Sequence, residues 1–479
     1  MLRLDSTSNN VPLAHFVARW IFTLLRFYLK IKRSEFAPND DVVRKPFGVY
    51  QYLNLFGRTR IPCVDSDMPH QAQDPKHIVV NRRNVFYSLT LLNGEVLPTI
   101  AEIASQIDWI LEHTPTGDHT LGALTTLNRD HWAKLRYRLA AYDSKNKSSL
   151  KMLDNAFFVV CLDETFPLHL SATTKNAVYG DGRNRWFDKP LQLIFTPDNQ
   201  LALNIEHSGL DGYPVIRFFT DANQYYQQLD DESAVPSQVA VKSPVPLQWN
   251  LPEEILETIQ PAAENVEHLI AQHETRVLEF KEFGRLLIVQ QQLQADALVQ
   301  LSLQLTYFRL YGKMASVYES VSMGHFRYGR VEGIRSVTVE SLRLIKTLTD
   351  NIPNNNRWQT LKQANDSHVS LLANAMNGAG CDRHLLALHS LARQHGVIPD
   401  IFRDKVYTEV FSQSILSTTS LPLDCLISFH PTVTDGYGIF YSIKPDRIIF
   451  TITSQQQQID KFVDLLKLSL SELVNLKPQ

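Results

Sequence analysis

The chain has 479 residues and a mass of 54.7 kDa, more than one hydrophobic core usually organises, so its length predicts about two domains and excludes a small binding module. Its 44% apolar and 20% charged residues exclude general disorder. A net charge of −3 and a pI of about 6.6 give no basic surface for nucleic acid or an anionic membrane, which favours small-molecule ligands.

The first predicted element is an amphipathic helix over residues 14–33, whose apolar positions follow helical spacing. The basic residues around it also suit a transit peptide, but a core helix explains the same pattern and is the preferred interpretation. The apolar stretch 17–29 is interrupted by Arg19 and Arg26, so no transmembrane segment is predicted.

Short apolar runs predict strands at 77–80 and 86–92. Two more strands are predicted at 191–195 and 201–205, where the turn-forming residues 196–200 suit a hairpin. Because helical and strand-like segments alternate, we expect a mixed α/β fold.

The composition shifts over 229–250, where prolines stand among acidic residues and serines, as is typical of an interdomain connection. We therefore predict an N-terminal domain over 1–245 and a C-terminal domain over 246–479. Pro252 suits the first turn of a following helix, which Pro261 would bend.

In the second half, helices are predicted around 298–308 and 459–473, and strands at 425–429, 438–443 and 447–453. No solenoid repeat, phosphate loop or dinucleotide-binding glycine pattern occurs. The cysteines lack metal-type spacing, so we expect free thiols, a reducing compartment and no metal site. We also expect no permanently bound cofactor.

His207 follows the apolar run 201–205 and precedes a glycine-containing turn. The end of a strand can hold an imidazole rigidly in a cleft, where it can act as a general base. The chain has sixteen histidines, so position alone supports this role weakly, and a surface or core histidine explains the observation more simply.

The run Glu206-His207-Ser208, followed by Asp211, resembles the catalytic segment of the carnitine/choline acyltransferase family. Six other segments resemble motifs of the family in the same order: 184–189, 318–320, 329–336, 382–386, 416–418 and 435–438. The resemblance covers roughly residues 12–475 and rests on motif order rather than on one short pattern.

The resemblance implies an α/β fold of two chloramphenicol-acetyltransferase-like halves, each a mixed sheet flanked by helices, with an active-site tunnel at their interface. It also implies direct acyl transfer between coenzyme A and a small trimethylammonium alcohol, without a covalent enzyme intermediate. His207 would be the base that takes the proton from the alcohol or, in reverse, from the thiol.

Two further catalytic assignments follow from the resemblance. Where the family has Ser-Thr-Ser, this chain has 417–419, so Thr419 would donate its hydroxyl to the oxyanion, a contact worth about 3 kcal/mol, with an added methyl group. Asp211 matches a family acidic position four residues after His207, and a turn-stabilising role is an equal alternative.

For the acceptor, the resemblance implies that Tyr318 and Arg383 bind the carboxylate of carnitine, with Ser417 as a further contact. A guanidinium offers a fixed fork for a carboxylate, whereas the choline branch has asparagine at this position. The structural alternative is that Arg383 pairs with Asp382. Val331 replaces the threonine of the carnitine branch and matches the choline branch, so the acceptor site is a hybrid.

The residues that the resemblance assigns to coenzyme A are Arg285, Asp296, Glu319, Ser320 and Ser420. Val289 stands where the family has a second phosphate-binding lysine, so weaker or differently arranged binding is expected. Ile427 fills the position that glycine opens in long-chain branches, which predicts short acyl groups over palmitoyl.

The leading interpretation is a short-chain carnitine acyltransferase of fatty acid metabolism, with acyl-CoA and carnitine as substrates. Choline or another amino alcohol is an alternative acceptor, and a non-catalytic binding or regulatory protein on this scaffold is an alternative of another class. We expect a monomer in the cytoplasm without nucleic acid, and leave mitochondrial and secreted-effector locations open. The helices with which family members usually begin are expected to be missing or replaced.

Overall fold

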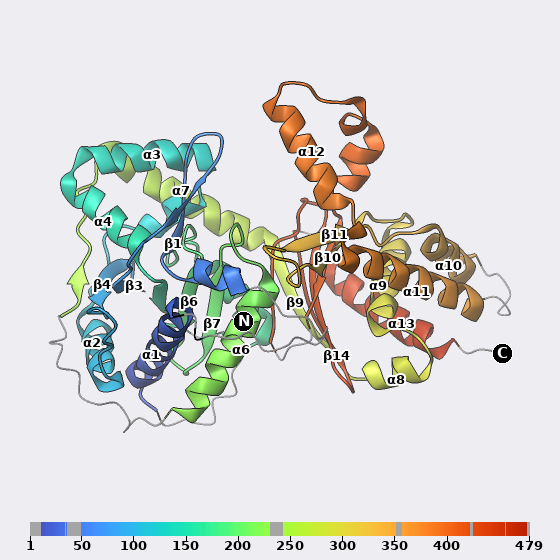
Figure 1. The fold of residues 1–479 in the computed structure, drawn as a ribbon, viewed down its shortest axis with the longest axis horizontal. Coiled ribbons are helices and arrows are strands. Elements are labelled where there is room, and N and C mark those ends of the chain that lie inside the picture. Colours follow the sequence, from blue (N-terminus) through green and yellow to red (C-terminus); the bar gives the residue numbers. More distant parts are fainter. Residues whose placement is uncertain are drawn as a thin grey trace. The chain divides into compact units, whose positions relative to one another are not determined.

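The computed structural model describes residues 11–33, 35, 49–165, 167–229, 243–350, 357–421, 425–455 and 457–476 (Figure 1). The chain forms two compact units, Met1–Ala271 and Gln272–Gln479. Within the described residues, each unit contains a six-stranded sheet that mixes parallel and antiparallel pairs, so the expected mixed α/β class is confirmed.

The sheet of the N-terminal unit has the strand order β7-β6-β5-β3-β4-β8. Its strands are β3 (His77–Arg82), β4 (Val85–Thr90), β5 (Val159–Leu162), β6 (Leu191–Phe195), β7 (Leu201–Ile205) and β8 (Val245–Pro246). The predicted hairpin of β6 and β7 is confirmed. The turn between β3 and β4 is shorter than predicted, because Arg83 and Asn84 adopt positive φ angles and form the turn by themselves.

The helices of this unit are α1 (Leu13–Lys32), α2 (Ile100–His113), α3 (Arg129–Tyr142), α4 (Ser144–Asn155), α5 (Leu170–Tyr179), α6 (Gly212–Gln228) and α7 (Glu253–Gln272), with 3₁₀ turns η1 (Val49–Leu55) and η2 (Leu121–Thr126). The predicted first helix is confirmed as a core helix, because Trp20 is fully buried and stacks on Tyr226 of α6 at 4.7 Å. A hairpin of β1 (Arg58–Ile61) and β2 (Met68–Gln71) stands apart from the main sheet.

The C-terminal unit has the strand order β11-β10-β12-β13-β14-β9. Its strands are β9 (His273–Phe280), β10 (Val317–Ser322), β11 (Val331–Ile334), β12 (Leu416–Ser420), β13 (Tyr437–Ile443) and β14 (Ile448–Gln455). The pairs β10–β12 and β12–β13 are parallel, and the others are antiparallel.

Helices α9 (Ala295–Tyr311) and α13 (Ile459–Asn475) contribute most helical residues to the core of this unit. The remaining helical segments are α8 (Arg285–Gln290), α10 (Val339–Thr349), α11 (Arg357–Asn374), η5 (Ala375–Ala379), α12 (Asp382–Gln394), η6 (Asp400–Phe402) and η7 (Val406–Phe411). In Figure 1, α12 projects away from the edge of the sheet that carries β10 and β11.

The two units divide at the last residue of α7, between Ala271 and Gln272, which is later in the chain than the predicted boundary at 245. Of the predicted connection 229–250, residues 230–242 lie outside the described part. Helix α7 packs on the N-terminal unit, where Ile255 and Ile259 are buried in the core. Glu267 of the same helix forms an ion pair with Arg183, with 2.6 Å between Nη2 and Oε2. A composition shift therefore marks a loop, but tertiary packing decides to which unit the next helix belongs.

The strand predicted at 425–429 is wrong, and Asp424 lies outside the described residues. This segment is irregular, and it crosses the face of the sheet: the Ser428 hydroxyl lies 2.9 Å from that of Thr453 on β14. A Cβ on Gly438 of β13 would lie 2.6 Å from the carbonyl oxygen of Phe429. Strands β13 and β14, against which the segment lies, are each paired on both edges, so it cannot pair with either of them.

In the described part of the chain, no helix combines the length and the apolar character needed to cross a membrane.

We expect Gly122→Ala to destabilise the N-terminal unit by about 3 kcal/mol, because an added Cβ would lie 2.1 Å from the carbonyl oxygen of Arg183 and 2.4 Å from that of Arg185. The control Gly94→Ala meets no neighbour and should cost only the roughly 1–2 kcal/mol of its left-handed backbone. Urea unfolding of both variants checks this, and equal losses would contradict it.

Candidate functional site

His207 lies in the turn between β7 and α6, and its side chain is exposed. The turn is fixed from η1, where the Asn54 side-chain amide donates to the carbonyl oxygen of Gly209 at 2.8 Å. A Cβ on Gly209 would lie 2.7 Å from the guanidinium of Arg58, so the turn and the β1 strand approach closely. The structure therefore holds His207 on a short, anchored turn at the half-buried end of β7.

Asp211 is the residue at the N-cap position of α6, where its buried side chain makes no capping hydrogen bond to the helix. The side-chain amide of Gln51 donates to its carboxylate at 2.9 Å, and the amide nitrogen of Asp211 donates back to the Gln51 side-chain oxygen at 2.8 Å. This reciprocal pair ties the end of the His207 turn to η1. The contacts are those of an anchoring residue, and sequence reasoning missed its partner Gln51.

In the C-terminal unit, the parallel pairing of β10 with β12 brings several predicted residues together. Ser417 lies opposite Tyr318 in the register, and the hydroxyls of Ser320 and Thr419 are 2.7 Å apart. Because side chains alternate along a strand, Thr418 points to the other face, where its hydroxyl donates to the carbonyl oxygen of Tyr318 at 2.8 Å. Thr419 is thus presented beside a second hydroxyl.

Thr418 is held from α9 by Gln300, whose side-chain amide donates to its hydroxyl at 2.9 Å. The same amide donates to the Tyr441 hydroxyl at 2.9 Å, and Tyr441 donates to Asp296 at 2.6 Å. A buried polar chain therefore connects the strand of Thr419 with Asp296. Gln300 and Tyr441 carried no motif, so sequence reasoning missed them.

Arg383 lies at the start of α12 and donates to the hydroxyl of Tyr318. Its guanidinium also stands over the Tyr318 ring, 5.4 Å from the centroid, as does that of Arg335 at 5.3 Å. Arg383 contacts Asp382 at 3.2 Å, but Asp382 is bound more closely by two nitrogens of Arg335, at 2.7 and 3.0 Å. The side chain of Arg383 keeps 39% of its surface exposed and can receive an anion.

Val331 is placed differently from the other predicted acceptor residues. It begins β11 and lies opposite Ser322, at the far end of β10 from Tyr318. Ile427 lies half-buried in the irregular segment that crosses the sheet, between the buried Leu426 and the half-buried Ser428.

A cavity of about 540 Å³ opens beside α8 and the start of α9. Three residues predicted to contact coenzyme A, Arg285, Asp296 and Ser420, line it. Val289 also lines it with an exposed apolar side chain, at the position where the resemblance would place a second cation. The cavity therefore has one guanidinium, one carboxylate and an apolar wall.

Behind the cavity wall, Asp296, Glu319 and His368 bring three metal-ligand-type atoms within 4.8 Å of one another, a grouping found once among the described residues. His368 Nε2 lies 3.2 Å from Asp296 and 3.5 Å from Glu319. Tyr441 and His368 already bond the two carboxylate oxygens of Asp296. The group is thus a hydrogen-bonded cluster in this structure. Sequence reasoning missed His368.

Burial and the neighbouring charge of Asp296 raise the pKa of Glu319 well above its ordinary value. Burial would also raise the pKa of Asp296, but its bonds from His368 and Tyr441 lower it. The two pKa values are shifted in opposite directions, so Glu319 keeps its proton to a higher pH than Asp296 does. Glu319 is only 3% exposed and supports the cavity from behind.

The family model described as choline/carnitine O-acyltransferase matches residues 3–468. The chain belongs to this family. Among similar curated proteins, mitochondrial carnitine O-palmitoyltransferase 2 of Xenopus tropicalis is 32% identical over 89% of this chain and 66% of the relative. Carnitine O-acetyltransferase of Rattus norvegicus is 30% identical over 92% of this chain and 72% of the relative. The chain thus spans about two thirds of the length of these relatives.

Solved structures give weaker likenesses. The wax ester synthase/diacylglycerol acyltransferase from Marinobacter aquaeolei aligns with a TM-score of 0.30 and 14% identity, over 60% of this chain and 71% of that one. The epimerization domain of tyrocidine synthetase B aligns with a TM-score of 0.32 and 10% identity, over 67% and 81% of the two chains.

We expect Glu319→Gln to flatten the pH dependence of stability in the C-terminal unit. Folding raises the pKa of Glu319, so the folded state keeps a proton that the unfolded chain releases once the pH exceeds the ordinary pKa of a glutamate. The stability of the wild type therefore falls as the pH rises above that ordinary pKa. The side chain of the variant is neutral at every pH. The Tm of the variant minus that of the wild type should therefore be about 2–4 °C larger at pH 8 than at pH 5. The exposed control Glu409→Gln should show no such trend. A difference independent of pH would contradict the prediction.

Proposed function

We propose that the protein reversibly transfers a short acyl group between coenzyme A and carnitine, with His207 as general base. The observation that carries this proposal is the pairing of β10 with β12, which sets the Thr419 hydroxyl on the strand next to Tyr318, to whose hydroxyl Arg383 of α12 donates. Family membership and the names of the two carnitine acyltransferase relatives support it.

In the proposed reaction, His207 takes the proton from the hydroxyl of carnitine as its oxygen attacks the acyl carbon of the thioester. The tetrahedral intermediate carries an oxyanion, to which the Thr419 hydroxyl donates a hydrogen bond. Ser320 contacts Thr419 at 2.7 Å and orients it. The carbon–sulfur bond then breaks, and the thiolate receives the proton that His207 holds.

The acceptor assignment rests on Arg383. Its fork keeps an exposed face and already binds the Tyr318 hydroxyl, so a carboxylate can bridge the two groups. Choline has no carboxylate and would leave this cation unused. Val331 favours choline, but its place opposite Ser322 sets it apart from the Arg383–Tyr318 pair.

For coenzyme A, the proposal uses the cavity lined by Arg285, Asp296 and Ser420. Arg285 supplies a cation for phosphate, and the apolar Val289 supplies none. The loss of one charged phosphate contact costs about 1–3 kcal/mol, so coenzyme A should bind this chain less tightly than a site with two cations.

For the acyl group, we propose acetyl to butyryl donors. The resemblance places the half-buried Ile427 where long-chain branches have glycine, so its side chain would fill space that a longer chain needs, and overpacking of this kind costs about 1–3 kcal/mol. Relatives at similar identity include both an acetyl- and a palmitoyltransferase, so the names of the relatives do not favour either acyl length. The preferred acyl length is therefore measured directly.

The test is thiol release from acetyl-, octanoyl- and palmitoyl-CoA, with carnitine and choline supplied separately. Acetyl-CoA with carnitine should give the highest kcat/KM. We expect His207→Ala to lower kcat by about 100-fold or more with folding unchanged, because only proton transfer is removed. His119→Ala replaces an exposed histidine of the same unit and should retain full activity. Activity of the His207 variant within tenfold of wild type would remove His207 from the mechanism.

We expect Arg383→Asn to raise the KM for carnitine at least about tenfold and to change that for choline little, because only carnitine presents a carboxylate to the lost guanidinium. Arg403→Asn, which replaces an exposed arginine further along the same projecting segment, serves as the matched control. Equal effects on the two alcohols would instead assign Arg383 to the structural support of Tyr318 and Asp382.

A further inference from the structure

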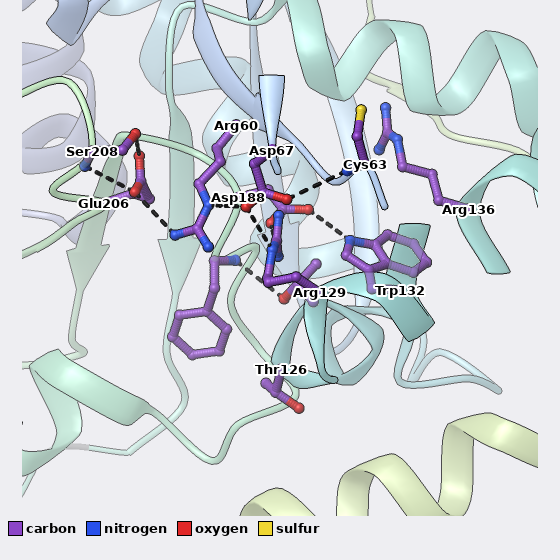
Figure 2. Close-up of polar contacts among 12 residues, drawn as sticks. Arg60, Cys63, Asp67, Thr126, Arg129, Trp132, Arg136, Asp188, Glu206 and Ser208 are labelled. Atoms are coloured by element: carbon purple, nitrogen blue, oxygen red, sulfur yellow. Dashed lines mark hydrogen bonds and ion pairs between the residues drawn. The ribbon is translucent and has the colours of Figure 1, made fainter. Parts of the chain in front are cut away.

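A chain of alternating charges runs from the buried Asp188 to the turn that carries His207, through residues that the proposed mechanism does not use (Figure 2). Resting on the proposed function, we propose that Arg60 is a positioning residue for His207 and acts through Glu206.

Glu206 closes the turn around His207. One carboxylate oxygen accepts a hydrogen bond from the amide nitrogen of Ser208 at 2.9 Å, and the other accepts one from the Ser208 hydroxyl at 2.7 Å. The backbone on both sides of His207 is therefore fastened to one side chain, of which only 8% is exposed. The orientation of this carboxylate sets the conformation of the turn.

Arg60 holds that carboxylate from β1. Its Nη1 donates to the oxygen of Glu206 that also receives the Ser208 amide, at 3.2 Å, as Figure 2 shows. Its Nε donates to Asp67, which stands just before β2. The fork of the guanidinium thus spans from the hairpin to the His207 turn, a geometry that a point charge cannot reproduce.

The other end of this series of ion pairs, at Asp188, is buried in the N-terminal unit. Asp67 also accepts from Arg129 of α3 at 2.8 Å, and Arg129 donates to Asp188 at 2.6 Å. The indole of Trp132 donates to the other oxygen of Asp188 at 2.7 Å, and that carboxylate is 1% exposed. The backbone nitrogen of Arg60 donates to the carbonyl oxygen of Asp188 at 2.9 Å. The hairpin is thereby attached to the buried segment by both its backbone and its side chains.

The two arginines favour the ionised form of Asp67 in this series of ion pairs. Burial alone would raise the pKa of Asp67, but the bonds from Arg60 and Arg129 lower it. Arg60 contacts Asp67 and Glu206, whereas Arg129 contacts Asp67 and Asp188. Among the contacts drawn in Figure 2, Glu206 is therefore paired with Arg60 and with no other cation. Among the described residues, loss of Arg60 leaves Glu206 with hydrogen bonds only to Ser208 of its own turn. A shift of about 1 Å in a reacting group can cost roughly 100-fold in rate.

The central experiment compares Arg60→Met with Arg60→Lys. We expect Arg60→Met to lower kcat about 10- to 100-fold while the KM for both substrates stays within about twofold, since no substrate contact is removed. Arg60→Lys should recover part of the loss. The control Arg138→Met removes an exposed ion pair with Glu254 in the same unit and should leave kcat unchanged.

A double-mutant cycle tests the route through Glu206. If Arg60 acts through this carboxylate, Arg60→Met combined with Glu206→Gln should be no slower than the slower single variant. Multiplying effects would overturn the route. If Arg60→Met does not fold, Glu206→Gln, which keeps the shape of the side chain, is subjected to the same kinetic measurements, and an unchanged kcat there would overturn the proposal.

Hydrogen exchange of the segment 206–211, measured without substrate, tests the geometry independently of catalysis. It should be faster in Arg60→Met than in wild type and unchanged in Arg138→Met. Unchanged exchange in Arg60→Met, or a raised KM with normal kcat, would overturn the proposal. A wild-type protein without acyl transfer would contradict the proposed function alone, and the exchange result would then decide the role of Arg60.

Discussion

The parallel pairing of β10 with β12 is the constraint on which the C-terminal site depends. It joins residues about a hundred positions apart, so that Ser417 faces Tyr318 and the hydroxyls of Ser320 and Thr419 touch. A slip of one residue would turn every hydroxyl of β12 to the opposite face of the sheet. The helical contact of Gln300 with Thr418 opposes such a slip, because it would leave a buried amide without its acceptor.

This pairing also connects two regions with different tasks. The polar chain from Thr418 through Gln300 and Tyr441 ends at Asp296, which lines the cavity. Buried polar groups are tolerated only when they are bonded, so the cavity wall and the strand of Thr419 must keep matching positions. The N-terminal unit uses the same principle with full charges, where alternating arginines and carboxylates tie the His207 turn to the core.

Local patterns predicted those elements whose neighbours are close in sequence, such as the hairpin of β6 and β7 and the turn after it that carries His207. Apolar composition failed at 425–429, because it indicates burial but cannot tell whether a sheet edge is free. Arg60 and Asp67 carried no signal, since their hairpin lacks an apolar alternation and their partners are distant in the chain. Tertiary packing alone assigns α7 to the N-terminal unit.

The order of the elements has a consequence for how the chain is made. The last strand of the first sheet ends at Pro246 and α7 ends at Gln272, whereas β9 of the second sheet begins only at His273. Among the described residues, each sheet takes all its strands from its own unit. The N-terminal unit, with the His207 turn already fastened, can therefore complete its fold on the ribosome while the second sheet is still being synthesised.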